Sequence, residues 1–320
     1  MNATSSRSWL LANFAPLLFA ALASTAAVAT TTSIVTINAT RAGITIPLLV
    51  VDSSCTTADV DCEAPVATLI LFTGGDGRLH LLEPTGGWVG ASDLSTVRIG
   101  PTQNFLLRQR YQFAGPDPTS DPNEPTLRYH VIMMDVPSDQ SGGYTVNATT
   151  GLSFRKTAKH QSDIADVIDY ARTTYNLPVW LIGTSNGTTS ATKGALIAAQ
   201  NPDTSKVADG GPDGVVLTSP ITESGNANDV TAMDLKSIGL VAMMVSSELD
   251  QCAASPPLGV YRIARHLVAS PDFRGKIVTD PDTPYSTAAS EVCEGDGYHG
   301  FSNSEGRAVD PIRAWIAGHL

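Results

Sequence analysis

The stretch that decides the fold is VWLIGTSNGT, residues 179–188, in which an apolar run leads directly into a G-x-S-x-G motif. The motif alone is a weak signal, but its setting is specific. Residues 177–183 predict a strand buried on both faces, and residues 188–200 predict the helix behind it. A sharp turn from strand to helix needs side chains to be absent beside the serine, as they are at the two glycines of the motif. We therefore predict that the hydroxyl of Ser185 is held exposed above the end of a strand.

On either side of this stretch, segments with the composition of β-strands alternate with segments that have the periodicity of amphipathic helices. Strands are predicted at residues 33–39 and 43–51, as an antiparallel opening pair, and at residues 66–72, 129–136, 177–183, 215–217, 240–245 and 276–279. Helices are predicted around residues 164–171 and at residues 188–200, 258–268 and 305–317. This alternation is typical of an α/β protein with a mainly parallel sheet covered by helices on both faces.

The composition is that of a globular, acidic chain. It has 320 residues, of which 42% are hydrophobic and 16% charged, and its formal net charge is −11. A surface of this sign repels phosphate backbones and anionic lipid headgroups, so no nucleic acid and no membrane surface is expected as a partner.

Residues 1–29 have the pattern of a secretory signal peptide. Their only charged residue is Arg7, an apolar run covers residues 10–23, and small residues at Ala27 and Ala29 fit a cleavage site. No later stretch is apolar enough to span a bilayer. We therefore expect residues 30–320 to form one secreted or periplasmic domain with no stable membrane anchor.

Four cysteines in an exported chain predict two disulfides. They allow three connectivities, and proximity in the sequence favours Cys55 with Cys62 and Cys252 with Cys293. The second bond would join the two loops that hold the candidate acid and base described below. Neither pair has the spacing of metal ligands and no histidine cluster accompanies them, so no metal is expected. No cofactor is expected either.

A serine hydroxyl needs a base to take its proton, and the base needs an acid to orient it. When the serine lies in the turn between a strand and a helix, the acid and then the histidine follow it in the sequence. Of the later histidines, His266 falls inside a predicted helix and His319 is the penultimate residue, which leaves His299 in a glycine-flanked loop. The earlier His80, His130 and His160 are interpreted as ordinary, partly exposed residues.

The acid is expected just past the strand at residues 240–245. Asp250 is favoured there, and Glu248 is the alternative because its longer side chain could also reach the histidine.

Attack on a carbonyl places negative charge on its oxygen, and backbone N–H groups must meet that charge. One donor is expected to be Asn186, directly after the serine. The other is expected from the loop TGGDG at residues 73–77, where glycines let the backbone approach a substrate. Gly75 is favoured over Gly74, and Asp76 is a further alternative.

Together, residues 183–187, the loop at residues 73–75, the segment Asp250-x-Cys252 and residues 293–301 resemble an α/β-hydrolase of the secreted serine esterase kind. The resemblance covers nearly all of the mature chain and implies an eight-stranded, mostly parallel sheet, a Ser-Asp-His triad and no metal. Thr73 stands where many lipases and esterases have histidine. Too few residues separate the strands at 215–217 and 240–245 for a large cap domain.

The function implied by this resemblance is the cleavage of carboxylic esters, small or polymeric, through an acyl-enzyme. A serine peptidase or amidase using the same triad is the nearest alternative. A binding protein that keeps the fold without the chemistry is the alternative from another class.

Overall fold

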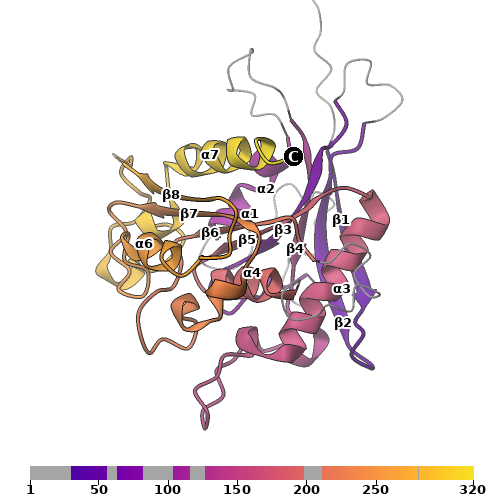
Figure 1. The fold of residues 1–320 in the computed structure, drawn as a ribbon, viewed down its shortest axis with the longest axis horizontal. Helices are drawn as coiled ribbons and strands as arrows, with labels where there is room; N and C mark the ends of the chain where they lie inside the picture. Colours follow the sequence, from indigo (N-terminus) through magenta and orange to yellow (C-terminus); the bar gives the residue numbers. More distant parts are fainter. Residues whose placement is uncertain (1–29, 56–62, 82–103, 116–126, 198–210, 280) are drawn as a thin grey trace, which may run out of the picture.

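The computed structural model describes residues 30–55, 63–81, 104–115, 127–197, 211–279 and 281–320. They form an eight-stranded sheet in the order β1-β2-β4-β3-β5-β6-β7-β8 (Figure 1). The strands are β1 (Thr31–Asn38), β2 (Thr45–Asp52), β3 (Ala67–Phe72), β4 (Tyr129–Met134), β5 (Val179–Thr184), β6 (Gly214–Thr218), β7 (Val241–Ser247) and β8 (Phe273–Val278). β2 is antiparallel to both of its neighbours, and the other pairs are parallel. The predicted fold class is confirmed.

Helices cover both faces of the sheet (Figure 1). On one face lie α1 (Phe105–Arg108), α2 (Arg110–Ala114) and α7 (Glu305–Ala317), and on the other lie α3 (Ala158–Tyr175), α4 (Gly187–Ala195) and α6 (Gly259–Ala264). Side chains alternate between the two faces along a strand. In β3, Leu69 and Leu71 accordingly pack into the α7 core, while Ile70 packs into the α3 core.

The helix predicted around residues 164–171 is the centre of α3. Its buried stripe contains Ile164, Val167, Ile168 and Ala171, as the spacing predicted. The helix begins after Thr157, whose side chain accepts the N–H of His160, and ends at Asn176 in the left-handed conformation. Both ends are therefore capped locally by the sequence.

Three parts of the prediction differ from the structure. The helix expected at residues 258–268 is only α6, because the chain turns after Ala264 and buries Leu267 from outside the helix. β8 begins at Phe273, three residues before its predicted start, since this edge strand is largely exposed and has no apolar run there. The short helices α1 and α2 were not predicted, because four and five residues are too few to show a period.

The connection from β6 to β7, residues 219–240, contains two single turns of 3-10 helix and no inserted cap domain. Within the described ranges, no helix is both long enough and apolar enough to cross a membrane. The predicted signal peptide at residues 1–29 and Cys62, the predicted partner of Cys55, lie outside the described residues.

Candidate active site

The candidate residues meet at the carboxyl ends of the parallel strands, where loops from different strands come together. Ser185 follows β5, the loop at residues 73–77 follows β3, and Asp250 follows β7. A cavity of about 590 Å³ opens at this edge of the sheet. Ser185, His299 and the residues proposed as oxyanion donors all line it, while Asp250 lies behind His299.

Ser185 occupies a strained turn. Its φ of 51° is in the left-handed region, which costs a residue other than glycine about 1–3 kcal/mol. Its N–H donates to the carbonyl of Thr218 across 3.0 Å, which ties the turn to β6. A β-carbon at Gly183 would overlap the backbone of Gly187, and one at Gly187 would overlap the backbone of Phe72. The turn therefore requires both glycines of the motif.

His299 is paired with Asp250. Nδ1 of the imidazole lies 2.9 Å from Oδ2 of the carboxylate, and both side chains are buried. The other carboxylate oxygen, Oδ1, accepts the N–H of Cys252 across 2.9 Å. Because an ionised carboxylate only accepts, the proton lies on Nδ1, and the neutral ring presents a lone pair at Nε2. Glu248, the alternative acid, is exposed at the surface.

Nε2 of His299 is buried and has no hydrogen-bond partner among the described residues. The hydroxyl of Ser185 is therefore not hydrogen-bonded to His299 in this structure, although both residues line the same cavity. Contacts of this kind are commonly long before a substrate is bound. The structure brings the candidate acid and the candidate base into contact, and it brings Ser185 to the same cavity as His299.

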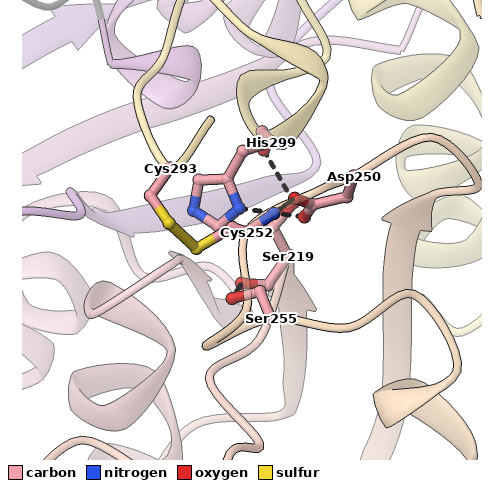
Figure 2. Close-up of a disulfide and its surroundings, with 6 residues drawn as sticks. All are labelled: Ser219, Asp250, Cys252, Ser255, Cys293 and His299. Atoms are coloured by element: carbon pink, nitrogen blue, oxygen red, sulfur yellow. Dashed lines mark hydrogen bonds and ion pairs between the residues drawn. A yellow bond between two sulfur atoms is a disulfide. The ribbon is translucent and has the colours of Figure 1, made fainter. Parts of the chain in front are cut away.

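Two further contacts hold the histidine loop in place, and a third holds Ser219, which makes one of them. Cys252 and Cys293 form a disulfide that joins the loop carrying Asp250 to the segment before His299. Figure 2 shows this disulfide beside the imidazole. Ser219 donates its hydroxyl to the carbonyl of His299 across 2.7 Å, and Ser255 donates to the carbonyl of Ser219 across 3.0 Å.

Arg108 of α1 supports the same loop from the other side, and sequence reasoning missed it. Its guanidinium donates to the carbonyls of Gly295 and Gly300 at 3.0 and 2.9 Å and pairs with Glu305 at 2.9 Å. A single arginine in an unpredicted helix carries no sequence signal for such a role, because its acceptors are backbone oxygens.

The loop after β3 lies against the serine turn. A β-carbon on Gly74 would stand 3.0 Å from Cβ of Ser185, so the absence of a side chain permits this approach. Gly75 has a φ of 57°. The side chain of Asn186 donates to the carbonyl of Gly75 across 3.1 Å, so a hydrogen bond joins the loop after β3 to the turn that carries Ser185. The predicted donors Asn186, Gly74, Gly75 and Asp76 are thus neighbours on one wall of the cavity.

Two histidines interpreted as partly exposed are buried, which corrects that interpretation. His130 stacks on Tyr175 with ring centroids 3.8 Å apart, and burial lowers its pKa. His160 is fully buried and its pKa lies well below the usual value, chiefly because of burial and then because of the nearby charges of Arg155, Arg41 and Lys193. Among the described residues, no group of three or more His, Cys, Asp or Glu side chains could hold a metal ion.

Comparisons with known proteins identify the fold. No protein-family model matches the sequence, and a search of curated proteins finds no relative. The chain is similar in structure to a carboxylesterase from Lactobacillus plantarum WCFS1, with 14% identity, a TM-score of 0.50, and coverage of 91% of this chain and 98% of the other. It is also similar to brefeldin A esterase, a bacterial homologue of human hormone sensitive lipase, with 14% identity, a TM-score of 0.50, and coverage of 93% and 79%. The chain has the α/β-hydrolase fold, as the resemblance predicted.

Proposed function

We propose that the protein is an exported serine hydrolase that cleaves carboxylic esters through an acyl-enzyme. Ser185 is the nucleophile, His299 the general base and acid, and Asp250 the residue that orients His299. The observation that carries this proposal is the convergence on one cavity of a serine with a φ of 51° and a buried His299–Asp250 pair with Nδ1 and Oδ2 2.9 Å apart.

In the first half of the reaction, Oγ of Ser185 attacks the ester carbonyl carbon while Nε2 of His299 takes the hydroxyl proton. The resulting tetrahedral intermediate collapses as the bond to the leaving alcohol breaks and Nε2 gives that alcohol its proton. In the second half, water attacks the acyl-enzyme, its proton passes to Nε2, and the carboxylic acid leaves as Ser185 recovers the proton. Asp250 stays ionised throughout and stabilises the imidazolium.

The oxygen that becomes negative in both halves needs fixed donors. The N–H of Asn186, at the amino end of α4, is one proposed donor, and its place at a helix amino terminus adds a favourable dipole. The second comes from the loop at residues 73–77, with Gly75 favoured over Gly74 and Asp76 as the alternative.

Esters are preferred to amides as substrates because both structural neighbours named above are esterases by description. The Cys252–Cys293 disulfide supports export, since such bonds persist in oxidising compartments. Cleavage of residues 1–29, a single catalytic domain at residues 30–320, and the Cys55–Cys62 bond belong to the same proposal.

The test is a panel of p-nitrophenyl esters and peptide p-nitroanilides presented to the purified chain. We expect turnover of one or more esters and loss of at least about a thousandfold in kcat for Ser185→Ala. Ser141→Ala, which changes an exposed serine outside the cavity, is the matched control and should match the parent protein. Ester turnover that survives Ser185→Ala contradicts the assignment, and turnover of anilides in preference to esters favours the amidase alternative.

A further inference from the structure

A buried arginine lies directly behind the loop that follows β3. Arg155 sits in the short 3-10 turn Phe154–Lys156, its side chain is 1% exposed, and it does not line the cavity. Nη2 lies 3.1 Å from the carbonyl oxygen of Thr73 and 3.4 Å from that of Gly75. Nη1 donates to Oγ of Ser190 across 2.7 Å. One guanidinium therefore contacts both the loop and helix α4.

The hydrogen-bond acceptors of this cation among the described residues are all neutral. They are two carbonyl oxygens and a hydroxyl, and the ring of Tyr144 lies over the guanidinium with its centroid 4.4 Å away. Burial lowers the pKa of Arg155 to about 10. The carboxylate of Asp76 favours the charged form, but it is hydrogen-bonded to Arg78. A buried cation without a hydrogen-bonded counter-ion is costly, and an apolar residue of similar size would avoid that cost.

The orientation of the two peptide groups supplies a reason for an arginine at this position. In a trans peptide the C=O and the following N–H point in opposite directions. Because Thr73 and Gly75 direct their carbonyls at Arg155, the N–H groups of Gly74 and Asp76 point away from it. Gly74 and Asp76 both line the cavity, so this orientation would present their N–H groups to it. Hydrogen bonds to a cation also polarise the peptide groups and strengthen their N–H donors.

The hydrogen bond from Arg155 to Ser190 connects the same guanidinium to helix α4. Ser190 lies one turn into α4, whose amino end carries Ser185 and Asn186. Because Arg155 donates to Oγ of Ser190, the hydroxyl hydrogen is available to Nε2 of His160, 2.8 Å away. The pKa of His160 lies well below its usual value, so its ring is neutral and adds no second charge.

We propose that Arg155 is a positioning residue for the oxyanion hole: it sets the spacing between the loop at residues 73–76 and the amino end of α4, and turns the N–H groups of Gly74 and Asp76, the alternatives to Gly75 as donor, toward the cavity. This inference rests on the proposed ester hydrolysis at Ser185. Arg155 does not line the cavity and would act through N–H groups that bind the carbonyl oxygen most strongly when it is negative, so the expected effect is on kcat rather than on KM.

The experiment compares Arg155→Met, Arg155→Lys and Arg172→Met with the parent protein on a p-nitrophenyl ester. Arg172 is the control, because it also binds a backbone carbonyl, that of Gly211 at 2.6 Å, but in the segment before β6, where it pairs with Asp213 as well. We expect Arg155→Met to lower kcat by at least about tenfold while KM stays within about threefold, as for an interaction made in the transition state. Arg155→Lys, which keeps a cationic donor, should recover part of kcat.

The melting temperature of each variant separates positioning from general destabilisation. Arg172→Met should lose stability with kcat within about twofold of the parent. The rate of Ser185 labelling by a fluorophosphonate should fall in Arg155→Met in parallel with kcat. If Arg155→Met does not fold, Ser190→Ala removes the Nη1 acceptor, together with the contact of the same hydroxyl to His160, and should still lower kcat at constant KM.

A kcat for Arg155→Met or Ser190→Ala equal to that of the parent overturns the inference and leaves the proposed function standing. So does an equal loss of kcat in Arg172→Met at a matched melting temperature. A parent protein that hydrolyses no ester and whose Ser185 takes up no fluorophosphonate is a different result, which overturns the proposed function and the role of Arg155 together.

Discussion

Nδ1 of His299 lies 2.9 Å from Oδ2 of Asp250, although the two residues come from loops 49 positions apart in the sequence. Both side chains are buried, and Oδ1 of Asp250 is occupied by the N–H of Cys252. The carboxylate is thereby held in one orientation, with one oxygen for the backbone and one for the imidazole. This pair defines which ring nitrogen, Nε2, remains without a hydrogen-bond partner among the described residues.

Replacing the acid tests the pair directly. Asp250→Asn keeps the size of the side chain but removes the charge that holds the proton on Nδ1, so we expect kcat/KM to fall by about a hundredfold or more. Glu248→Gln is the control, because Glu248 is exposed and two residues away. It should stay within about twofold of the parent in the same steady-state assay. A larger loss for Glu248→Gln than for Asp250→Asn would assign the acid to Glu248.

The Cys252–Cys293 disulfide is expected to matter for rate as well as for stability. It closes a loop of 41 residues, and the double variant Cys252→Ser/Cys293→Ser should lose about 4 kcal/mol of unfolding free energy. Because the bond also joins the loops of Asp250 and His299, kcat should fall by about tenfold or more at a temperature where the variant remains folded. Unfolding by urea and initial rates measure the two effects. A loss of unfolding free energy without any change in kcat would show that the disulfide only stabilises the fold.

Gly74 is expected to be required for activity because of its distance from the serine. A β-carbon there would stand 3.0 Å from Cβ of Ser185 and 3.2 Å from the carbonyl oxygen of Thr184, so Gly74→Ala must push the loop away from the turn. We expect kcat to fall by about tenfold or more. Gly142→Ala serves as the comparison, since its β-carbon would meet no atom within 4 Å. Equal rates for the two variants would show that the approach of Gly74 is not needed.

Stability should decline in mild acid because of a buried neutral histidine. The pKa of His160 in the folded chain lies well below the value of about 6.5 expected when unfolded, so below about pH 6.5 the unfolded chain binds more protons. The contribution of His160 to the unfolding free energy is therefore complete above about pH 6.5, and it falls as the pH decreases toward the pKa of His160 in the folded chain.

Urea titrations at pH 7.5 and 5.5 measure this decline, and His160→Gln isolates it from other groups. Asp135 acts with the opposite sign, since burial raises its pKa and its contribution is lost as the pH rises. We expect a smaller difference between the two pH values in His160→Gln than in the parent. An identical difference in both proteins would assign the acid sensitivity to other groups.

The parts of the fold that the sequence predicted are those with a local pattern. β3 and β5 are continuous apolar runs, α3 has a regular buried stripe, and the glycines around Ser185 report a turn that excludes side chains. Chain order and loop position together indicated Asp250 and His299, which the structure brings into contact.

The residues that support the site could not be found in this way. Arg108 and Arg155 bind backbone carbonyl oxygens in loops far away in the sequence. Every residue has such a carbonyl, so no sequence motif indicates which one an arginine binds. The burial of His160 likewise depends on its packing against Ser190 and Tyr144, from two separate segments.

The most direct test of the account is intact-mass measurement after exposure to a fluorophosphonate, because the reagent reports whether His299 activates Ser185 without requiring the natural substrate. We expect one adduct on the parent protein, none on Ser185→Ala, and labelling slowed by at least about a hundredfold in His299→Ala. Undiminished labelling of Ser185→Ala, or equal labelling rates in the parent and His299→Ala, would contradict the assignment of Ser185 as a nucleophile activated by His299.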